Sequence, residues 1–392
     1  MKLSIDRILT THVGSLPRSS VLNDLLLKQE QGEDIDENNL AQIAAKDVDR
    51  VVRGQVDAGC DVINDGEQPR VGFQTYVPRR MTGFDGESNR PPVPDFIKFP
   101  LYAELVRSRG VRKAKIDSAP EAVAEVKYGD LSEAREEAAM FASALENASA
   151  NVRETFMTAA SPGVIAVTML NQHYDRYEDY VYALAREMKT EYEFVVGEGH
   201  VLQLDCPDLA MERGRLFADR PLAAFRDAVA LHIDAINMAI ADISPDRVRL
   251  HCCWGNWDGP HVDDVDLAEI LPLLYEAKVG ALSLPLANPR HQHEYSVIKQ
   301  TPPPDHMILI PGVIDPTTNV VEHPEVVANR IAEAINAVGD RERVLAGTDC
   351  GFGTFAGSDM VAGDVVWAKL ETLTEGARLA SERAWVGGAS GN

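Results

Sequence analysis

The sequence has few cysteines and no long apolar run. Its five cysteines are odd in number and scattered, which excludes a regular disulfide framework and favours reduced thiols in a cytosol-like compartment. A transmembrane helix needs about 18 consecutive apolar residues, and no such run is present. The first residues also lack the apolar core of a signal peptide, so we expect a cytoplasmic protein.

Positive charge is scarce as well. The chain has 38 Lys and Arg against 61 Asp and Glu, which gives a formal net charge of −23 at pH 7. A surface of this kind repels phosphate backbones and anionic lipids, so we expect neither nucleic acid nor a membrane as partner. With 45% hydrophobic residues in 392, the chain can nevertheless bury a large core.

Short apolar segments alternate with segments of helical period along the whole chain. The first long helical pattern begins at Asp36 and ends before Gly59. Eight strands are expected, at 8–12, 61–65, 155–159, 201–205, the run that ends at Cys253, 281–284, 308–313 and 344–348. Further helices are expected at 131–148, 175–196, 221–240, 264–277, 324–338 and 364–385. This alternation predicts an α/β fold, a single parallel (β/α)8 TIM barrel that spans residues 1–392.

Residues 71–130 follow no clear period and contain several prolines. They carry a basic cluster made of Arg107, Arg109, Arg112, Lys113 and Lys115. Long loops in compact proteins are usually functional, so we interpret this segment as an insertion after the second strand, acting as a lid or as a contact in a homo-oligomer. A solvated charged surface is an alternative interpretation.

Polar residues close the predicted strands, and in a parallel barrel such residues converge on one mouth. His251 and Cys253 are two residues apart, so their side chains leave the strand on the same side. Imidazole nitrogen and thiolate sulfur are donors that zinc prefers, and Cys350 after the last strand offers a third. The sequence therefore predicts a zinc site. The alternatives are a buried structural thiol at Cys350 and helix-capping roles for Glu67 and Asp205.

Five motifs resemble, in order and spacing, the C-terminal catalytic barrel of cobalamin-independent methionine synthase, a family with short single-barrel zinc relatives such as epoxyalkane:coenzyme M transferase. The motifs are 10–17, 65–67, 203–205, 251–253 and 348–351. The resemblance implies that a zinc ion held by His251, Cys253 and Cys350 activates a substrate thiol as a zinc thiolate. It also implies that Ser15 and Glu67 hold an amino-acid substrate and that Asp205 helps to bind its amine.

Two positions depart from the family pattern. Pro285 stands where the family has a zinc-binding glutamate, so we expect water or a nearby Glu294, His293 or His261 in the fourth zinc position. The family has a catalytic histidine shortly after the seventh strand, whereas this chain has Pro316 and Thr317 after Asp315. Asp315 is the residue that we assign to catalysis there.

The expected activity is zinc-dependent S-alkyl transfer between two small molecules, a thiol and an alkyl donor. The first candidate is methyl transfer to homocysteine from 5-methyltetrahydrofolate or another methyl donor. An epoxyalkane:coenzyme M transferase type of reaction is the alternative within the family. A metal-free barrel enzyme related to uroporphyrinogen decarboxylase and a non-catalytic zinc-binding protein are the alternatives of other classes.

Overall fold

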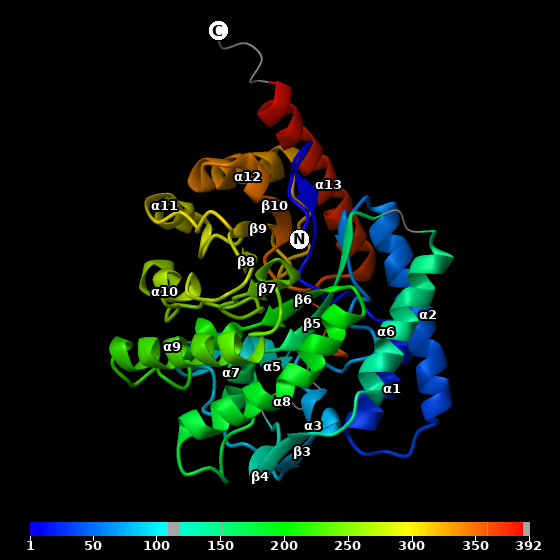
Figure 1. Ribbon diagram of the computed structural model, residues 1–392, viewed down its shortest axis with the longest axis vertical. Helices are drawn as coiled ribbons and strands as arrows, with labels where there is room; N and C mark the ends of the chain where they lie inside the picture. The colour runs from blue at the N-terminus through cyan, green and yellow to red at the C-terminus, as the bar shows by residue number, and fades with distance from the viewer. Residues whose placement is uncertain (109–117, 150–151, 359, 387–392) are drawn as a thin grey trace.

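The computed structural model describes residues 1–108, 118–149, 152–358 and 360–386, and eight parallel strands form a barrel within them (Figure 1). Their order around the barrel is β1-β10-β9-β8-β7-β6-β5-β2. The strands are β1 (Leu9–Thr10), β2 (Val62–Ile63), β5 (Glu154–Ala160), β6 (Val201–Asp205), β7 (Val248–His251), β8 (Ala281–Leu284), β9 (Ile308–Ile314) and β10 (Leu345–Thr348). The predicted α/β barrel is confirmed.

The barrel closes between its two shortest strands, β1 and β2. The Asp61 N–H donates to the Thr10 carbonyl at 3.2 Å, and the Thr11 hydroxyl donates to the Val62 carbonyl at 3.1 Å. The Asp61 carboxylate also accepts the Thr10 N–H at 2.9 Å. The turns that follow β1 and β2 are therefore neighbours at the barrel mouth.

Helices surround the strands, and several of them begin and end where the sequence indicates. The Asp36 side chain caps α2 (Glu37–Asp57) by accepting two backbone N–H groups, and α12 (Pro324–Val338) is followed by Gly339, whose φ of 80° suits glycine. The sequence did not predict α7 (Pro162–Thr168), because all its residues are buried and it has no polar face. The helices of the barrel are α1 (Ser20–Glu30), α2 (Glu37–Asp57), α6 (Ser132–Asn147), α7 (Pro162–Thr168), α8 (Tyr177–Gly197), α9 (Leu222–Ala239), α10 (Leu267–Leu274), α11 (Tyr295–Gln300), α12 (Pro324–Val338) and α13 (Gly363–Val386).

The lower part of the barrel interior is filled with apolar side chains. This layer consists of Leu9, Val62, Phe156, Val201, Ala281, Ile308, Ile310 and Leu345. A larger apolar core lies between the strands and the helices. Because the interior is packed, ligands can enter only at the mouth formed by the carboxyl ends of the strands.

A long insertion after β2 contributes its own short elements, as expected. They are α3 (Val77–Arg80), β3 (Met81–Asp85), α4 (Pro94–Lys98), α5 (Pro100–Ser108) and β4 (Glu121–Tyr128), and β3 pairs with β4 in an antiparallel two-stranded sheet, seen at the bottom of Figure 1. None of these elements exceeds nine residues, which hides their periods in the sequence. Of the basic cluster, Arg109, Arg112, Lys113 and Lys115 lie outside the described residues.

The insertion is tied to the loop that follows β7. The Asp95 carboxylate accepts the His261 N–H at 3.0 Å, the Tyr102 hydroxyl donates to the Asp258 carbonyl, and Lys98 forms an ion pair with Asp263. These contacts place α4 and α5 beside the barrel mouth. A role as lid or subunit contact remains a prediction.

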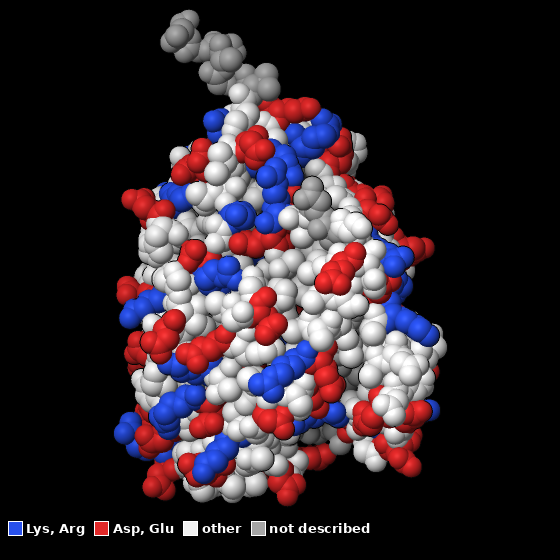
Figure 2. Space-filling view, turned by 45° about the vertical axis from the view of Figure 1, so that its right-hand side comes forward, with Lys and Arg blue, Asp and Glu red and all other residues white. Residues whose placement is uncertain are grey.

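Charged side chains of both signs are interspersed on the face shown in Figure 2. Within the ranges described, every helix is too short or too polar to cross a bilayer.

Candidate active site

A cavity of about 1280 Å³ opens at the carboxyl ends of the strands. It brings together all the predicted metal-binding and substrate-binding residues: Ser15, Glu67, Asp205, His251, Cys253 and Cys350. Residues of the insertion, among them Phe73, Tyr102 and Arg107, form part of its wall. The expected convergence of strand ends at one mouth therefore holds for these six side chains.

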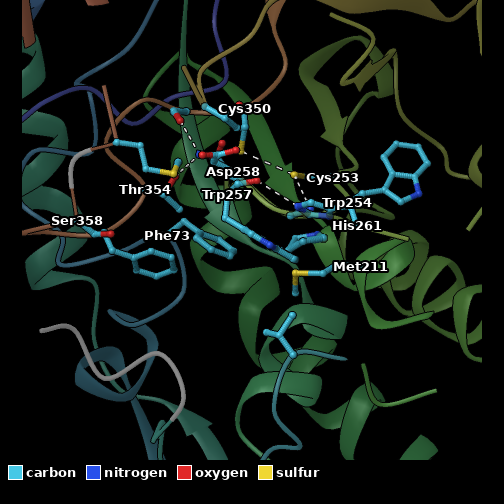
Figure 3. Close-up of a pocket in the computed structure, with 18 of the residues that line it drawn as sticks. Phe73, Met211, Cys253, Trp254, Trp257, Asp258, His261, Cys350, Thr354 and Ser358 are labelled. Carbon is cyan, nitrogen blue, oxygen red and sulfur yellow. Dashed lines mark hydrogen bonds between the residues drawn. The ribbon is translucent and has the colours of Figure 1, made fainter. Parts of the chain in front are cut away.

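The three predicted metal donors form a compact group. Their ligand atoms lie within 4.8 Å of one another, and the two sulfur atoms of Cys253 and Cys350 are 3.8 Å apart (Figure 3). His251 ends β7 and Cys253 follows two residues later, whereas Cys350 lies two residues beyond β10. One imidazole and two thiol groups in this arrangement match the donor set and spacing of a zinc site.

Neighbouring groups hold the His251 ring in place and shift the pKa values of the two cysteines in opposite directions. The Nδ1 atom of His251 lies 3.0 Å from Asp205 Oδ1. Burial disfavours the imidazolium, but hydrogen bonds with Asp205 and Cys253 outweigh burial and raise the pKa of His251 to about 10. The hydrogen bond from Cys350, helped by His251, holds the pKa of Cys253 well below its usual value and raises that of Cys350. The lowered pKa favours the thiolate form of Cys253, and zinc ligation requires deprotonated sulfur.

Pro285 follows β8 directly and is buried, and it carries no donor atom on its side chain. In the ladder between β7 and β8, His251 pairs with Ser283, so two further residues bring Cys253 opposite Pro285. Pro285 therefore lies beside the strand end that carries Cys253, and its equivalence to the family glutamate stays a prediction.

The residues expected to replace that glutamate are engaged elsewhere. His261 contacts Asp264 Oδ1 at 3.3 Å through Nδ1 and the Trp257 carbonyl at 3.1 Å through Nε2. Both Glu294 oxygens are used, one by His291 at 2.7 Å and one by the Leu267 N–H at 2.6 Å. His293 is exposed. Within the described part of the chain, the compact donor group therefore consists of three side chains.

The Glu67 carboxylate is a buried group without a protein partner for one of its oxygens. No described residue hydrogen-bonds to Oε2. Burial, and then the nearby Asp205, raise the pKa of Glu67 to about 8. Gly14, with φ of 144°, packs against this side chain so closely that a Cβ would lie 2.5 Å from Glu67 Oε1. The Glu67 backbone itself has a positive φ of 53°, which is uncommon for a residue other than glycine.

Ser15 lies between the β1 turn and the segment after β10. Its carbonyl accepts the Phe352 N–H at 2.8 Å, and a Cβ added at Gly351 would lie 2.0 Å from its Oγ. Asp205 Oδ1 accepts hydrogen bonds from both Gln203 Nε2, at 2.8 Å, and His251. Asp205 thus orients the histidine, and its role toward a substrate amine remains a prediction.

Asp315 is placed differently from the other predicted residues. Its Oδ1 accepts hydrogen bonds from the Thr317 N–H at 2.9 Å and hydroxyl at 2.7 Å, and its Oδ2 accepts one from Asn288 at 3.1 Å. Among the residues described, Thr317 lines the cavity and Asp315 does not. The Asp315 carboxylate shapes this turn, and a catalytic role for it remains a prediction.

Sequence reasoning missed side chains that hold the loops around the cavity. Asn256 donates to the Gly351 carbonyl and to Thr354, both at 2.8 Å, which joins the loops after β7 and β10. Asp349 accepts the Ala287 and Asn288 N–H groups and so holds the loop after β8. Such pairs are distant in sequence, and only proximity of Asn256 and Asp349 to the cysteines could have marked them.

The two tryptophans after Cys253 have different positions. Trp254 is almost completely buried, and its Nε1 donates to the Val265 carbonyl at 2.7 Å. Trp257 lines the cavity and stacks on His261, with ring centroids 3.9 Å apart. Both tryptophans therefore line the cavity, Trp254 from a buried position that packs its loop and Trp257 from a more open one (Figure 3).

Comparison with known proteins agrees with the motifs. The chain is 25% identical over 348 residues to a methionine synthase of Sulfolobus acidocaldarius, covering 87% of this chain and 85% of that protein. It is 24% identical over 379 residues to a methionine synthase of Saccharolobus islandicus, covering 95% of both. The chain resembles methionine synthases over nearly its whole length. The resemblance identified from the motifs is confirmed.

A second kind of relative shares a smaller part of the chain. A 2-hydroxypropyl-CoM lyase of Xanthobacter autotrophicus is 28% identical over 173 residues, which cover 38% of this chain and 44% of the lyase. Among solved structures, a B12-independent methionine synthase of a Shewanella species in complex with selenomethionine superposes with a TM-score of 0.72 at 18% identity, covering 97% of this chain and 99% of that one. This likeness confirms the barrel fold. No family model matches the chain.

Proposed function

We propose that the protein is a zinc-dependent, cobalamin-independent S-alkyltransferase with a methionine synthase-like reaction, the transfer of a methyl group to homocysteine. The observation that carries the proposal is the joint placement of His251, Cys253 and Cys350 with two buried carboxylates in one cavity. The methyl donor is 5-methyltetrahydrofolate or another methylated compound. Both substrates are small molecules.

His251, Cys253 and Cys350 would hold the zinc ion, which when bound supplies the positive charge that keeps a substrate thiol deprotonated at neutral pH. With three protein donors and Pro285 beside them, one position stays open for that thiol. Asp205 holds the His251 ring through Nδ1, and Nε2, which lies 3.3 Å from the Asp349 carbonyl, is the nitrogen that would bind the metal.

The carboxylates define the amino-acid side of the cavity. Glu67 Oε2 has no protein partner among the described residues, and a substrate ammonium group would supply one. Ser15, at the neighbouring turn, has a hydroxyl and lines the same cavity. Trp257 and Phe73 provide apolar walls of the same cavity.

One observation favours coenzyme M as an alternative thiol. Arg107 of α5 lines the cavity, is exposed and has no ionic partner among the described residues, and a guanidinium suits a sulfonate. The partial similarity to the 2-hydroxypropyl-CoM lyase also favours coenzyme M. Two nearby carboxylates, however, oppose a sulfonate and suit an amine, so homocysteine remains the first candidate.

A thiol screen on the zinc-loaded protein tests the proposal. X-ray absorption at the zinc edge should show one additional sulfur neighbour with homocysteine, and none with homoserine, which has a hydroxyl in place of the thiol. A response to coenzyme M that is stronger than that to homocysteine, and that is lost in Arg107→Ala, would support the alternative. Protein that takes up no zinc, or zinc that responds to neither thiol, would refute both reactions.

A further inference from the structure

A buried arginine lies inside the barrel directly below the candidate metal site. Arg249 precedes His251 by two residues on β7 and is 2% exposed. Its Nη1 donates to Thr11 Oγ1 at 3.0 Å and its Nη2 to the His12 carbonyl at 2.8 Å. Because β1 lies across the barrel from β7, these bonds pass through the interior. The guanidinium also stacks over the Phe156 ring, 3.5 Å from its centroid.

The third hydrogen bond of Arg249 leads toward the site. Its Nε donates to Gln203 Oε1 at 2.7 Å, and the Gln203 Nε2 donates to Asp205 Oδ1 at 2.8 Å. An arginine donor on one side and a carboxylate acceptor on the other allow only one orientation of the amide. The same Asp205 oxygen lies 3.0 Å from His251 Nδ1. A continuous hydrogen-bonded series therefore runs from Arg249 to His251.

The buried guanidinium of Arg249 is unusual for the interior of a barrel. Inward positions of such barrels are usually filled by apolar branched side chains, and burying a guanidinium costs several kcal/mol unless hydrogen bonds compensate it. All members of the series are at most 5% exposed, so water contributes little to holding them. The apolar layer of the barrel lies immediately below, which shows that the interior accommodates apolar residues.

We infer that Arg249 is a positioning residue, which fixes Asp205 through Gln203 and thereby the His251 ring. The same guanidinium holds Thr11 and His12 at the end of β1, and Gln203 Nε2 also donates to the Val13 carbonyl. The two sides of the cavity, metal donors on β7 and the Ser15 turn after β1, thus share one anchor. This inference rests on the zinc site proposed above.

Three variants test it. Gln203→Met keeps the side-chain length but removes its three hydrogen bonds, those with Arg249, Asp205 and the Val13 carbonyl, and Arg249→Met removes the anchor. Arg80→Met is the control, because Arg80 is also a buried arginine, held by ion pairs with Glu137 and with Glu191 at 3.2 Å, but does not line the cavity. Zinc affinity is measured by competition with a chelator, the donor set by the spectrum of the cobalt-substituted protein, and folding by thermal denaturation.

We expect the zinc dissociation constant to rise about tenfold or more in Gln203→Met and Arg249→Met, as for other groups that orient metal ligands. Arg80→Met should lower the melting temperature and leave zinc affinity unchanged. If Arg249→Met does not fold, Gln203→Met decides. Wild-type zinc affinity and an unchanged cobalt spectrum in folded Gln203→Met would overturn the inference.

A crystal structure of metal-free Gln203→Met separates this inference from the zinc proposal. We expect the Asp205 carboxylate and the His251 ring to be turned away from their wild-type positions. An unchanged pair would overturn the positioning role even if the wild-type protein bound no zinc. Failure of the wild type to bind zinc, with a displaced pair in the variant, would instead refute the proposed function alone.

Discussion

Replacing Glu67 by glutamine should remove a pH dependence from the use of an amino-acid thiol. The Glu67 carboxylate is buried in the cavity and lacks a protein partner for Oε2 among the described residues. Burial and the neighbouring Asp205 raise its pKa to about 8. The carboxyl group is therefore mostly neutral below that pH and mostly charged above it, and only the charged form attracts an ammonium group strongly.

The size of the effect follows from this pKa of about 8. The ionised fraction of such a group is about 9% at pH 7 and about 91% at pH 9, a tenfold rise. The wild-type kcat/KM for homocysteine should rise by about this factor relative to that of Glu67→Gln over the same range. Dividing the two proteins' values at each pH cancels the titration of the substrate's own amino and thiol groups.

The assay is steady-state kinetics from pH 7 to pH 9 with both proteins. A thiol without an amino group, such as coenzyme M, is the control, and its ratio between the two proteins should stay constant with pH. A constant ratio for homocysteine as well would refute the assignment of Glu67 to the substrate amine. A ratio that falls with rising pH would mean that the neutral carboxyl group binds the substrate.

Three further predictions concern the metal and the turns around it. His251→Ala and Cys350→Ser should each abolish the binding of about one zinc per chain without unfolding the barrel. The control Cys252→Ala, which changes a core residue beside the site, should keep the metal. Zinc retained in both His251→Ala and Cys350→Ser would contradict the ligand assignment. Pro285→Glu should raise zinc affinity and add an oxygen donor in X-ray absorption, and an unchanged donor set would place the missing glutamate elsewhere. Gly14→Ala should destabilise the protein by about 1–3 kcal/mol in denaturant titration, because Gly14 has a φ of 144° and an added Cβ would collide with the buried Glu67 carboxylate. The same variant should raise KM for homocysteine at constant zinc content. Unchanged kinetics would show that the Glu67 carboxylate does not bind the substrate.

Sequence reasoning located the elements whose signal is local. β6, β8 and α12 have the expected bounds, since each is a short buried run or an amphipathic helix with a marked start. The convergence of Glu67 with Cys350 was also predictable, because barrel topology alone brings strand ends together. The family resemblance supplied the expected roles of these residues, and the structure supplied the distances between them.

Contacts between residues that are far apart in the sequence could not be predicted from local patterns. Asp315 looks like any other polar strand end in the sequence, yet Thr317 and Asn288 engage its carboxylate. Arg249 looks like an exposed residue in an alternating strand, but its hydrogen bonds reach β1 and β6 through the barrel interior. Neither fact leaves a local pattern, because each depends on which side chains face each other across the fold.

The insertion gives the cavity a wall that is separate in sequence from the metal donors. Phe73, Tyr102 and Arg107 come from one continuous stretch between β2 and β5, whereas the donors sit on β7 and after β10. Two of its ties to the loop after β7, through Asp95 and Tyr102, reach backbone groups, and a third pairs Lys98 with the Asp263 side chain. The consequence is that a change in this stretch can alter which molecules fit the cavity without altering the metal donors, as long as the buried ion pairs of Arg80 with Glu137 and Glu191 are kept.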